Sequence, residues 1–308
     1  MVHVLPSPKA IDISRSKLLQ ALPTSGLGVE HTAKHLETDI LSGLNKPSCT
    51  ANFYGFVTGG VTEAAGLADH LVTKTDQNVQ VHLPRETIAT DVEDRALRMV
   101  CELLELASHD WVHRTFTTGA TASNVVGLAC GREYSIRRAA ERKGLGQIPS
   151  VAEHGLFKAM RLAGLDGIQV LTTVPHSSLR KAASIVGVGR DSVVDIGLNS
   201  EPHRFDLDLL ERYLQQGSVA SIVAVSCAEV NTGLFATTGD ELREIRRLCD
   251  QYGAWIHIDA AFGLLARVLP NTPEYQTLKS GVSGLELADS ITGDAHKLLN
   301  VVSVQVVV

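Results

Sequence analysis

The sequence has few cysteines, and no two of them stand at the CxxC spacing of a metal or redox site. Five cysteines are spread singly over 308 residues, and an odd, widely spaced set favours reduced thiols in the core over a disulfide framework. Histidine pairs at positions 31 and 35 and at 109 and 113 have the i, i+4 spacing of a zinc helix. Neither pair has an evident third ligand, and the second lacks the glutamate of HExxH. We therefore expect no metal site.

Long apolar runs and an excess of one charge are absent too. No stretch approaches the ~20 apolar residues of a membrane helix, and residues 1–17 carry prolines and charges where a signal peptide has its apolar core. The net charge of −6 indicates no basic surface for nucleic acid. The composition, 44% apolar and 20% charged, is that of an ordinary globular chain. These absences predict a soluble, cytoplasmic protein with neither a membrane nor a nucleic-acid partner.

Beyond residue 90 the sequence alternates between short β-prone runs and helical patterns. Repeated strand-then-helix units predict an α/β fold, with a mainly parallel central sheet, helices on both faces, and ligands outside the carboxyl ends of the strands. Residues 1–90, with one clear helical pattern at 61–72, are expected to form an N-terminal extension, and 91–308 a large ligand-binding domain. A Gly- and Pro-containing stretch at 141–153 is expected to be a surface loop. We predict strands at 114–118, 167–174, 192–196, 219–227 and 255–258, and helices at 91–107, 121–140, 177–186, 206–216 and 240–252.

Small residues open a predicted helix directly after a predicted strand at 119–124, Gly-Ala-Thr-Ala-Ser-Asn. Such residues let backbone amides approach an anion, and the hydroxyls of Thr121 and Ser123 could add hydrogen bonds to a phosphate. The same two hydroxyls could instead cap the helix. This run alone leaves both interpretations open.

Three further residues lie at predicted strand ends. Asp259 ends the strand expected near 255–258, and its carboxylate is either an N-cap or a functional anion facing the ligand crevice. Lys297 follows another short strand, beside His296. Semi-buried lysines form Schiff bases readily, although most lysines are solvated surface charges. His176 precedes a predicted helix, where a histidine is often part of the entry turn.

The order of these motifs is more specific than any one of them. Over residues 45–300 the sequence resembles the group II pyridoxal-phosphate-dependent amino-acid decarboxylases, which have the aspartate aminotransferase-like fold (fold type I). The strongest part of the resemblance is the pair formed by His-x-Asp-Ala-Ala and the later His-Lys. The motifs that carry it are 52–60 (NFYGFVTGG), 121–124 (TASN), 175–178 (PHSS), 229–233 (EVNTG), 257–261 (HIDAA) and 289–297 (DSITGDAHK).

The resemblance implies a role for each candidate residue. Lys297 would form a Schiff base with pyridoxal 5'-phosphate, and Asp259 would pair with the pyridine nitrogen and keep it protonated, which makes the ring an electron sink. His176 would stack on the ring face and lie near the reacting carbon, so that Lys297 and His176 are the catalytic residues. The other cofactor-binding residues would be Thr121, Ala122 and Ser123 at the phosphate, Ala261 against the ring, and His296 beside the Schiff base.

The function that the resemblance implies is a pyridoxal-phosphate-dependent carboxy-lyase that decarboxylates an L-amino acid, as a cytoplasmic homodimer. Three other reactions of the same cofactor remain open: aldehyde synthesis, transamination and carbon–sulfur lysis. Substrate positioning decides between them, because the bond that stands perpendicular to the ring is the one that breaks.

The last residues depart from the family's pattern. The resemblance ends near Val301, whereas the family continues with more strands, a mobile loop with a catalytic tyrosine and a small C-terminal domain. We therefore expect a C-terminally truncated chain, for which a catalytically inactive cofactor-binding remnant is a further alternative. The apolar tail at 302–308 is expected to be an exposed sheet edge that promotes association.

Overall fold

The structure is a computed structural model that describes residues 4–46, 50–51, 55, 59–146, 148–301 and 305–307, the last three by their backbone alone. The chain divides into two compact units. One contains Met1–Leu71 with His296–Val302, and the other contains Val72–Ala295 with Ser303–Val308.

The first unit is helical. Ser7 caps α1 by accepting a hydrogen bond from the Ala10 amide (3.2 Å), and Pro8 occupies the first helical position, so the Ser-Pro pair begins this helix. The amide of Thr62 donates to the carbonyl of Asn300 (2.9 Å), which joins the two chain segments of the unit. The helices are α1 (Pro8–Ser16), α2 (Val29–His35), the π-helical η1 (Leu36–Ile40), the short 3-10 helix η2 (Leu41–Gly43), α3 (Glu63–Thr75) and α12 (Ala295–Leu298), the last two extending slightly beyond the unit.

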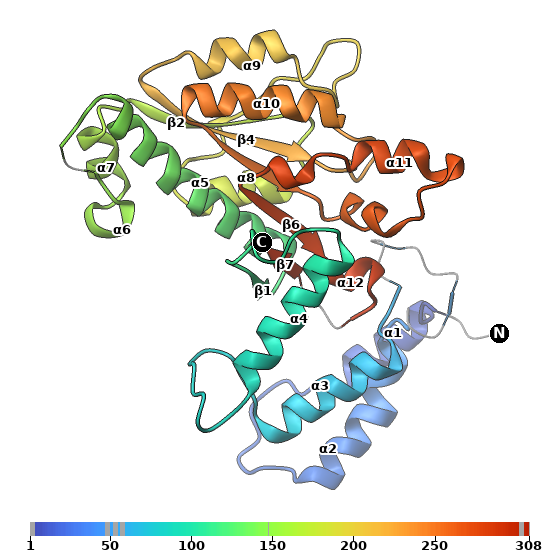
Figure 1. The fold of residues 1–308 in the computed structure, drawn as a ribbon. Coiled ribbons are helices and arrows are strands. Elements are labelled where there is room, and N and C mark those ends of the chain that lie inside the picture. The colour runs from blue at the N-terminus through green and yellow to red at the C-terminus, as the bar shows by residue number, and fades with distance from the viewer. Residues whose placement is uncertain are drawn as a thin grey trace. The chain divides into compact units, whose positions relative to one another are not determined.

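A seven-stranded sheet forms the centre of the second unit, in the order β1-β7-β6-β5-β4-β2-β3 (Figure 1). Five strands, β3, β2, β4, β5 and β6, run parallel, and β7 is antiparallel to both of its neighbours. The predicted mainly parallel sheet is confirmed. The strands are β1 (Thr115–Thr117), β2 (Gly167–Thr172), β3 (Val193–Asp195), β4 (Val219–Ser226), β5 (Trp255–Asp259), β6 (Ser290–Asp294) and β7 (Gln305–Val307).

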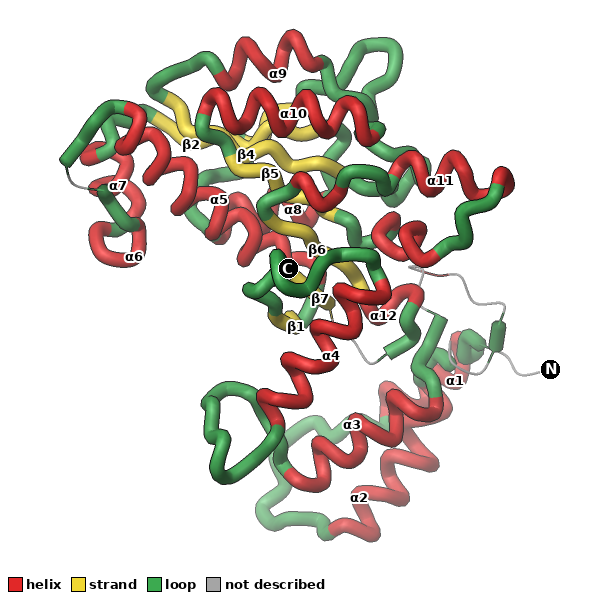
Figure 2. The backbone as a smooth tube through the Cα atoms, viewed as in Figure 1, coloured by secondary structure: helices red, strands yellow, loops and turns green. Residues whose placement is uncertain are grey.

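Helices cover both faces of this sheet (Figures 1 and 2). In β4, Ile222 packs in one core with α5 (Ala120–Arg142) and α8 (Ser177–Ile185), while the next residue, Val223, packs in another core with α9 (Leu207–Leu214) and α10 (Gly239–Tyr252). Because successive side chains of a strand point to opposite faces, a strand buried on both sides is mostly apolar, as β4 is apart from Ser221 and Ser226. The remaining helices of the unit are α4 (Ala89–Leu103), α6 (Val151–His154), α7 (Leu156–Leu162), η5 (Gly263–Val268), η6 (Pro273–Tyr275), α11 (Gln276–Gly281) and η7 (Leu285–Leu287).

The predicted strands and helices are present with shifts of a few residues at their ends, but the loop expected at 141–153 is partly wrong. Helix α5 continues to Arg142, α6 begins at Val151, and α7 was not predicted. Two side chains start α6: Ser150 accepts from the Ala152 amide, and the Glu133 carboxylate of α5 accepts from the Val151 amide (3.0 Å). The second of these bonds is a tertiary contact, which a local pattern does not reveal.

The expectation of an exposed apolar edge at the C-terminus is wrong. Strand β7 lies between β1 and β6, with Val306 opposite Phe116 on one side and Gly293 on the other. Its backbone groups therefore pair on both sides, and β1 and β3 are the outer strands of the described sheet.

The four cysteines that the structure describes are free thiols, and Cys101, Cys227 and Cys249 are buried as expected. Cys130 is exposed, so the prediction of a core position is wrong there, and Cys49 lies outside the described residues. Among the described residues, no three His, Cys, Asp or Glu side chains are grouped so that they could hold a metal ion. None of the described helices combines the length and apolarity needed to cross a membrane.

Candidate functional site

Helix α5 begins at the carboxyl end of β1 with an amino terminus that no described side chain caps. Its N-cap is Gly119, in extended backbone, and the Ser123 hydroxyl lies 2.7 Å from the Thr117 hydroxyl instead of bonding a first-turn amide. The alternative in which Thr121 or Ser123 caps the helix is therefore wrong. A 23-residue helix with uncapped first-turn amides is a favourable position for an anion. Thr121 and Ala122 are partly exposed at this end, and Ser123 is buried.

Asp259 is the last residue of β5 and is partly buried. Its Oδ2 accepts a hydrogen bond from Asn124 Nδ2 in α5 (2.9 Å), and its Oδ1 accepts from the Ala261 amide (3.3 Å). The next helical segment, η5, has Phe262 as its N-cap. The reading of Asp259 as a helix cap is thus wrong, and its carboxylate is anchored on the first turns of α5.

His176 is the N-cap of α8 and is exposed to solvent. Its Nδ1 accepts from the Ser178 amide (3.3 Å) and lies 2.8 Å from the Ser178 hydroxyl. That hydroxyl also accepts from Asn124 Nδ2 (3.1 Å). The entry-turn role of His176 is confirmed, and Asn124 connects it to Asp259.

A buried histidine lies behind Asp259 in the same strand. His257 is fully buried, with Nε2 2.9 Å from Asn124 Oδ1 and Nδ1 2.8 Å from the Ser290 hydroxyl of β6. Burial lowers the pKa of His257 from the ordinary 6.5 to about 4, against the opposing effect of the Asp259 charge. The imidazole is therefore neutral at pH 7. Room for it comes from Gly127 of α5, where a Cβ would lie 2.4 Å from two ring atoms.

Lys297 and His296 lie in α12, which begins at Ala295, the residue directly after β6. Both are partly buried, and both group with the first unit. Asp259 is opposite Thr292 in the pairing of β5 with β6, so Lys297 comes five residues after the strand neighbour of Asp259. Contacts within the second unit join α5, His176, Asp259 and Ala261, and His296 and Lys297 follow directly after β6 in the chain.

The residues that connect the site were not among the predicted site residues. Asn124, Ser178, His257 and Ser290 all lie within the quoted motifs, but none was given a role. The available signal was a polar residue within a strand: His257 stands between two isoleucines in β5, and a polar side chain buried in this way needs a partner. The partners themselves could not be read from the sequence, because Asn124 and Asp259 are 135 positions apart.

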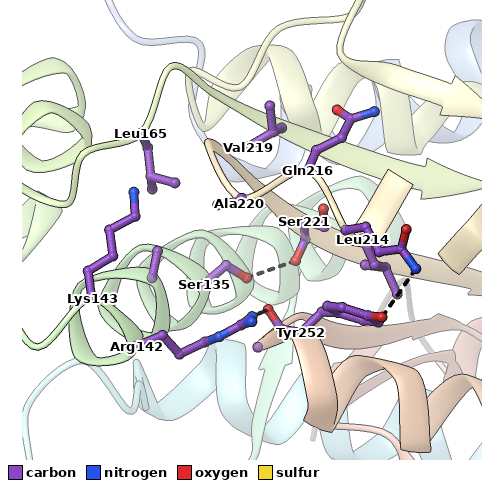
Figure 3. Close-up of a pocket in the computed structure, with 14 residues that line it drawn as sticks. Ser135, Arg142, Lys143, Leu165, Leu214, Gln216, Val219, Ala220, Ser221 and Tyr252 are labelled. Atoms are coloured by element: carbon purple, nitrogen blue, oxygen red, sulfur yellow. Dashed lines mark hydrogen bonds between the residues drawn. The ribbon is translucent and has the colours of Figure 1, made fainter. Parts of the chain in front are cut away.

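A pocket of about 270 Å³ lies at the other end of the sheet (Figure 3). Its two cations are already engaged with carbonyls: Lys143 donates to Ala163 (3.1 Å) and Arg142 donates to Tyr252. The Ser135 hydroxyl donates to the carbonyl of Ser221 (2.9 Å), as Figure 3 shows. Since parallel sheets bind ligands at the carboxyl ends of their strands, this pocket is not the candidate cofactor site.

The comparisons with known proteins identify the family of this chain. The sequence profile described as the pyridoxal-dependent decarboxylase conserved domain matches residues 18–307. The chain belongs to this family.

Two curated relatives are decarboxylases. The chain is 26% identical over 311 residues to the aspartate 1-decarboxylase of Aliivibrio fischeri, a match over 97% of this chain and 54% of the relative. It is 32% identical over 211 residues to the L-2,4-diaminobutyrate decarboxylase of Acinetobacter baumannii, over 63% of this chain and 38% of the relative. The chain thus spans about half of the first relative's length and less of the second's.

Solved structures share the fold. The crystal structure of Oryza sativa TDC with PLP matches 99% of this chain and 61% of its own, with a TM-score of 0.73 and 20% identity. The glutamate decarboxylase domain of a Vibrio parahaemolyticus protein matches 100% of this chain and 62% of its own, with a TM-score of 0.72 and 20% identity. At this identity the likeness shows the fold alone.

Proposed function

We propose that this chain binds pyridoxal 5'-phosphate and that the protein is an amino-acid decarboxylase, a carboxy-lyase of amino-acid metabolism. One observation carries the proposal: the Asp259 carboxylate is held by Asn124 beside the uncapped amino end of α5. Asn124, which holds the Asp259 carboxylate, follows the first-turn amides of α5 by only a few residues. The fixed carboxylate and the anion-binding helix end are therefore complementary to the two ends of the cofactor. The names of the curated relatives support the reaction type.

The residues present fit this cofactor. The first-turn amides of α5, with Thr121, Ala122 and Ser123, would hold the phosphate, and no side chain in the described part of the chain caps these amides. The Asp259 carboxylate retains unused lone pairs and would hold a proton at the ring nitrogen. His176 presents an exposed ring whose Nδ1 is fixed by Ser178, and the small Ala261 would lie beside the cofactor ring.

When bound, pyridoxal phosphate supplies an electron sink for the pair left when a bond to Cα breaks. Lys297 would supply the primary amine for the cofactor aldehyde, with His296 as its neighbour in α12. His176 would orient the substrate and shield the reacting carbon from water. Substrate orientation selects the bond that breaks, so product analysis separates amine and CO₂ from an aldehyde, a keto acid or a sulfur compound.

A Lys297→Ala variant tests the cofactor site. The wild-type chain with pyridoxal phosphate is expected to show a visible absorption band that borohydride reduction makes permanent, with the cofactor mass on the peptide containing Lys297. Lys297→Ala should lack both. Lys158→Ala, at an exposed lysine of α7, is the matched control and should behave as wild type. A folded wild-type chain without the band would refute the proposal, whereas a band without CO₂ release from any amino acid would favour the inactive remnant.

We also propose a cytoplasmic homodimer, with residues 1–90 as an extension and 91–308 as the cofactor-binding domain. Exposed apolar side chains in the first unit support a partner surface, since Leu22, Val29, Leu67 and Leu71 are 94%, 85%, 71% and 61% exposed. Sedimentation velocity should show a dimer that Leu67→Glu weakens. A wild-type chain that stays monomeric at micromolar concentration would contradict this.

A further inference from the structure

We propose that Asn124 is a positioning residue, held in one orientation toward Asp259 by a one-way chain of hydrogen bonds that starts at the indole of Trp255 and passes through Ser290 and His257. The direction of these hydrogen bonds is derived from the geometry alone. The role of Asn124 in cofactor binding rests on the function proposed above.

The two end groups of this hydrogen-bond chain, the Trp255 indole and the Asp259 carboxylate, fix the direction of every bond between them. An indole N–H can only donate, and a carboxylate can only accept. Trp255 Nε1 donates to the Ser290 hydroxyl at 2.9 Å, and Asp259 Oδ2 accepts from Asn124 at 2.9 Å. The amide nitrogen of Asn124 must therefore face Asp259, which leaves its oxygen facing His257.

His257 completes the chain in only one tautomer. Asn124 Oδ1 is an acceptor, so His257 Nε2, 2.9 Å away, must carry the proton. The lowered pKa of His257, about 4, leaves the ring neutral, and Nδ1 is then an acceptor. It takes the hydroxyl proton of Ser290 at 2.8 Å, and the Ser290 oxygen in turn accepts from Trp255. Every donor in this series of hydrogen bonds meets an acceptor.

Burial makes this orientation costly to reverse. Asn124 and His257 are fully buried, and Ser290 is 6% exposed. Turning the amide of Asn124 over would place its oxygen against the Asp259 carboxylate and its nitrogen against the Nε2 proton. A buried donor or acceptor without a partner costs more than an ordinary hydrogen bond contributes. The members therefore hold one another in place.

The same amide also aligns His176. Asn124 Nδ2 has two hydrogens, and the contacts at 2.9 Å to Asp259 and 3.1 Å to Ser178 use both. Ser178 in turn contacts His176 Nδ1. A single buried amide thus positions the anion expected at the ring nitrogen and the histidine expected at the ring face. It does so without relaying protons, because the amide stays neutral and keeps both of its hydrogens.

The first test uses the chain without cofactor, by ¹⁵N NMR of the His257 ring at pH 7. Wild type is expected to show a neutral ring protonated at Nε2. Asn124→Ala removes the acceptor for Nε2, so the proton should move to Nδ1, where the Ser290 oxygen can accept it. Ser135→Ala also removes a buried polar group of α5, but one outside this chain of hydrogen bonds, and it should leave the ring unchanged. A wild-type ring protonated at Nδ1, or at both nitrogens, would overturn the proposal.

The second test adds pyridoxal phosphate labelled with ¹⁵N in its ring. Asn124→Ala should weaken binding by about tenfold or more, the loss expected for a hydrogen bond to a charged group. It should also reduce the protonated fraction of the ring nitrogen, a signal that a general loss of stability would not move. Ser135→Ala should change neither. Unchanged affinity and ring protonation in a folded Asn124→Ala chain would overturn the positioning role. A wild-type chain with the predicted tautomer but no cofactor binding would overturn the proposed function and leave the bond direction standing.

Discussion

Replacing Gly127 by alanine tests the contact between α5 and β5 on which the site depends. An added Cβ would lie 2.4 Å from Cε1 and from Nδ1 of His257, and 3.2 Å from Cγ. Unstrained carbon contacts are about 3.5–4.0 Å, so the helix or the ring would have to move by roughly an ångström. That movement would strain the hydrogen bonds of His257 to Asn124 and Ser290.

Two effects of opposite sign decide how much Gly127→Ala changes the free energy of unfolding. Alanine in a helix interior is more favourable than glycine by about 1 kcal/mol. Overpacking a filled core costs about 1–3 kcal/mol, and weakening two buried hydrogen bonds adds roughly 1 kcal/mol each. The sum predicts that Gly127→Ala lowers the free energy of unfolding by about 2–4 kcal/mol.

Gly66 of α3 offers a matched control, because it is also helical but nothing lies within 4 Å of its added Cβ. Gly66→Ala should stabilise its helix by about 0.5–1 kcal/mol. Urea unfolding gives the total change, and hydrogen exchange of the amides in α5 and α3 assigns it to each helix. If Gly127→Ala slowed exchange in α5 as Gly66→Ala does in α3, the close approach of His257 would be refuted.

Three further changes have defined outcomes. The pKa of His257 is about 4 in the folded chain and has an ordinary value of 6.5. Between these pH values the unfolded chain therefore binds one more proton than the folded chain. The free energy of unfolding should fall by up to about 3 kcal/mol as the pH drops from 6.5 to 4. Urea unfolding at both pH values should show a smaller fall in His257→Gln, and an equal fall would contradict the assignment. Thr238→Ala removes the capping box at the start of α10 and should cost about 1 kcal/mol by thermal unfolding, whereas no change would mean that water replaces the cap. Asp289→Ala deprives the Ile256 amide and Arg246 of an acceptor (2.7 and 2.9 Å) and should cost about 1–3 kcal/mol; unchanged hydrogen exchange at the Ile256 amide would refute this.

Local patterns were sufficient for most elements of the second unit. Helix α10 illustrates why: Thr238 and Glu241 form a capping box at its start, and Gly253 ends it in the left-handed conformation, with a φ of 77°. Strand β4 is equally easy to predict, because burial on both faces leaves a run that is apolar except for Ser221 and the final Ser226. In both cases the signal lies within about fifteen neighbouring residues.

Pairing between distant segments could not be predicted in the same way. The apolar tail was assigned to an exposed edge because no local feature names its partners, yet β7 fits between β1 and β6. The same limit applies to the site. Thr121, Asp259 and His176 stand in motifs, but the bonds that join their elements run from Asn124 to residues 54, 133 and 135 positions away.

Asn124, His257 and Ser290 are buried polar residues, which are less favourable in a core than apolar ones. Their presence behind Asp259 is therefore an argument that this part of the fold serves a functional site. A buried asparagine, histidine and serine between a helix and a sheet contribute little net stability even when fully bonded, and apolar residues of similar volume would pack at no polar cost. Gly127 adds a further cost, since helix α5 has a glycine where alanine would be more stable in isolation. These unfavourable choices all lie at the single point where α5, β5 and β6 meet behind Asp259. Fold stability alone does not account for them, whereas the fixed orientation of one carboxylate does.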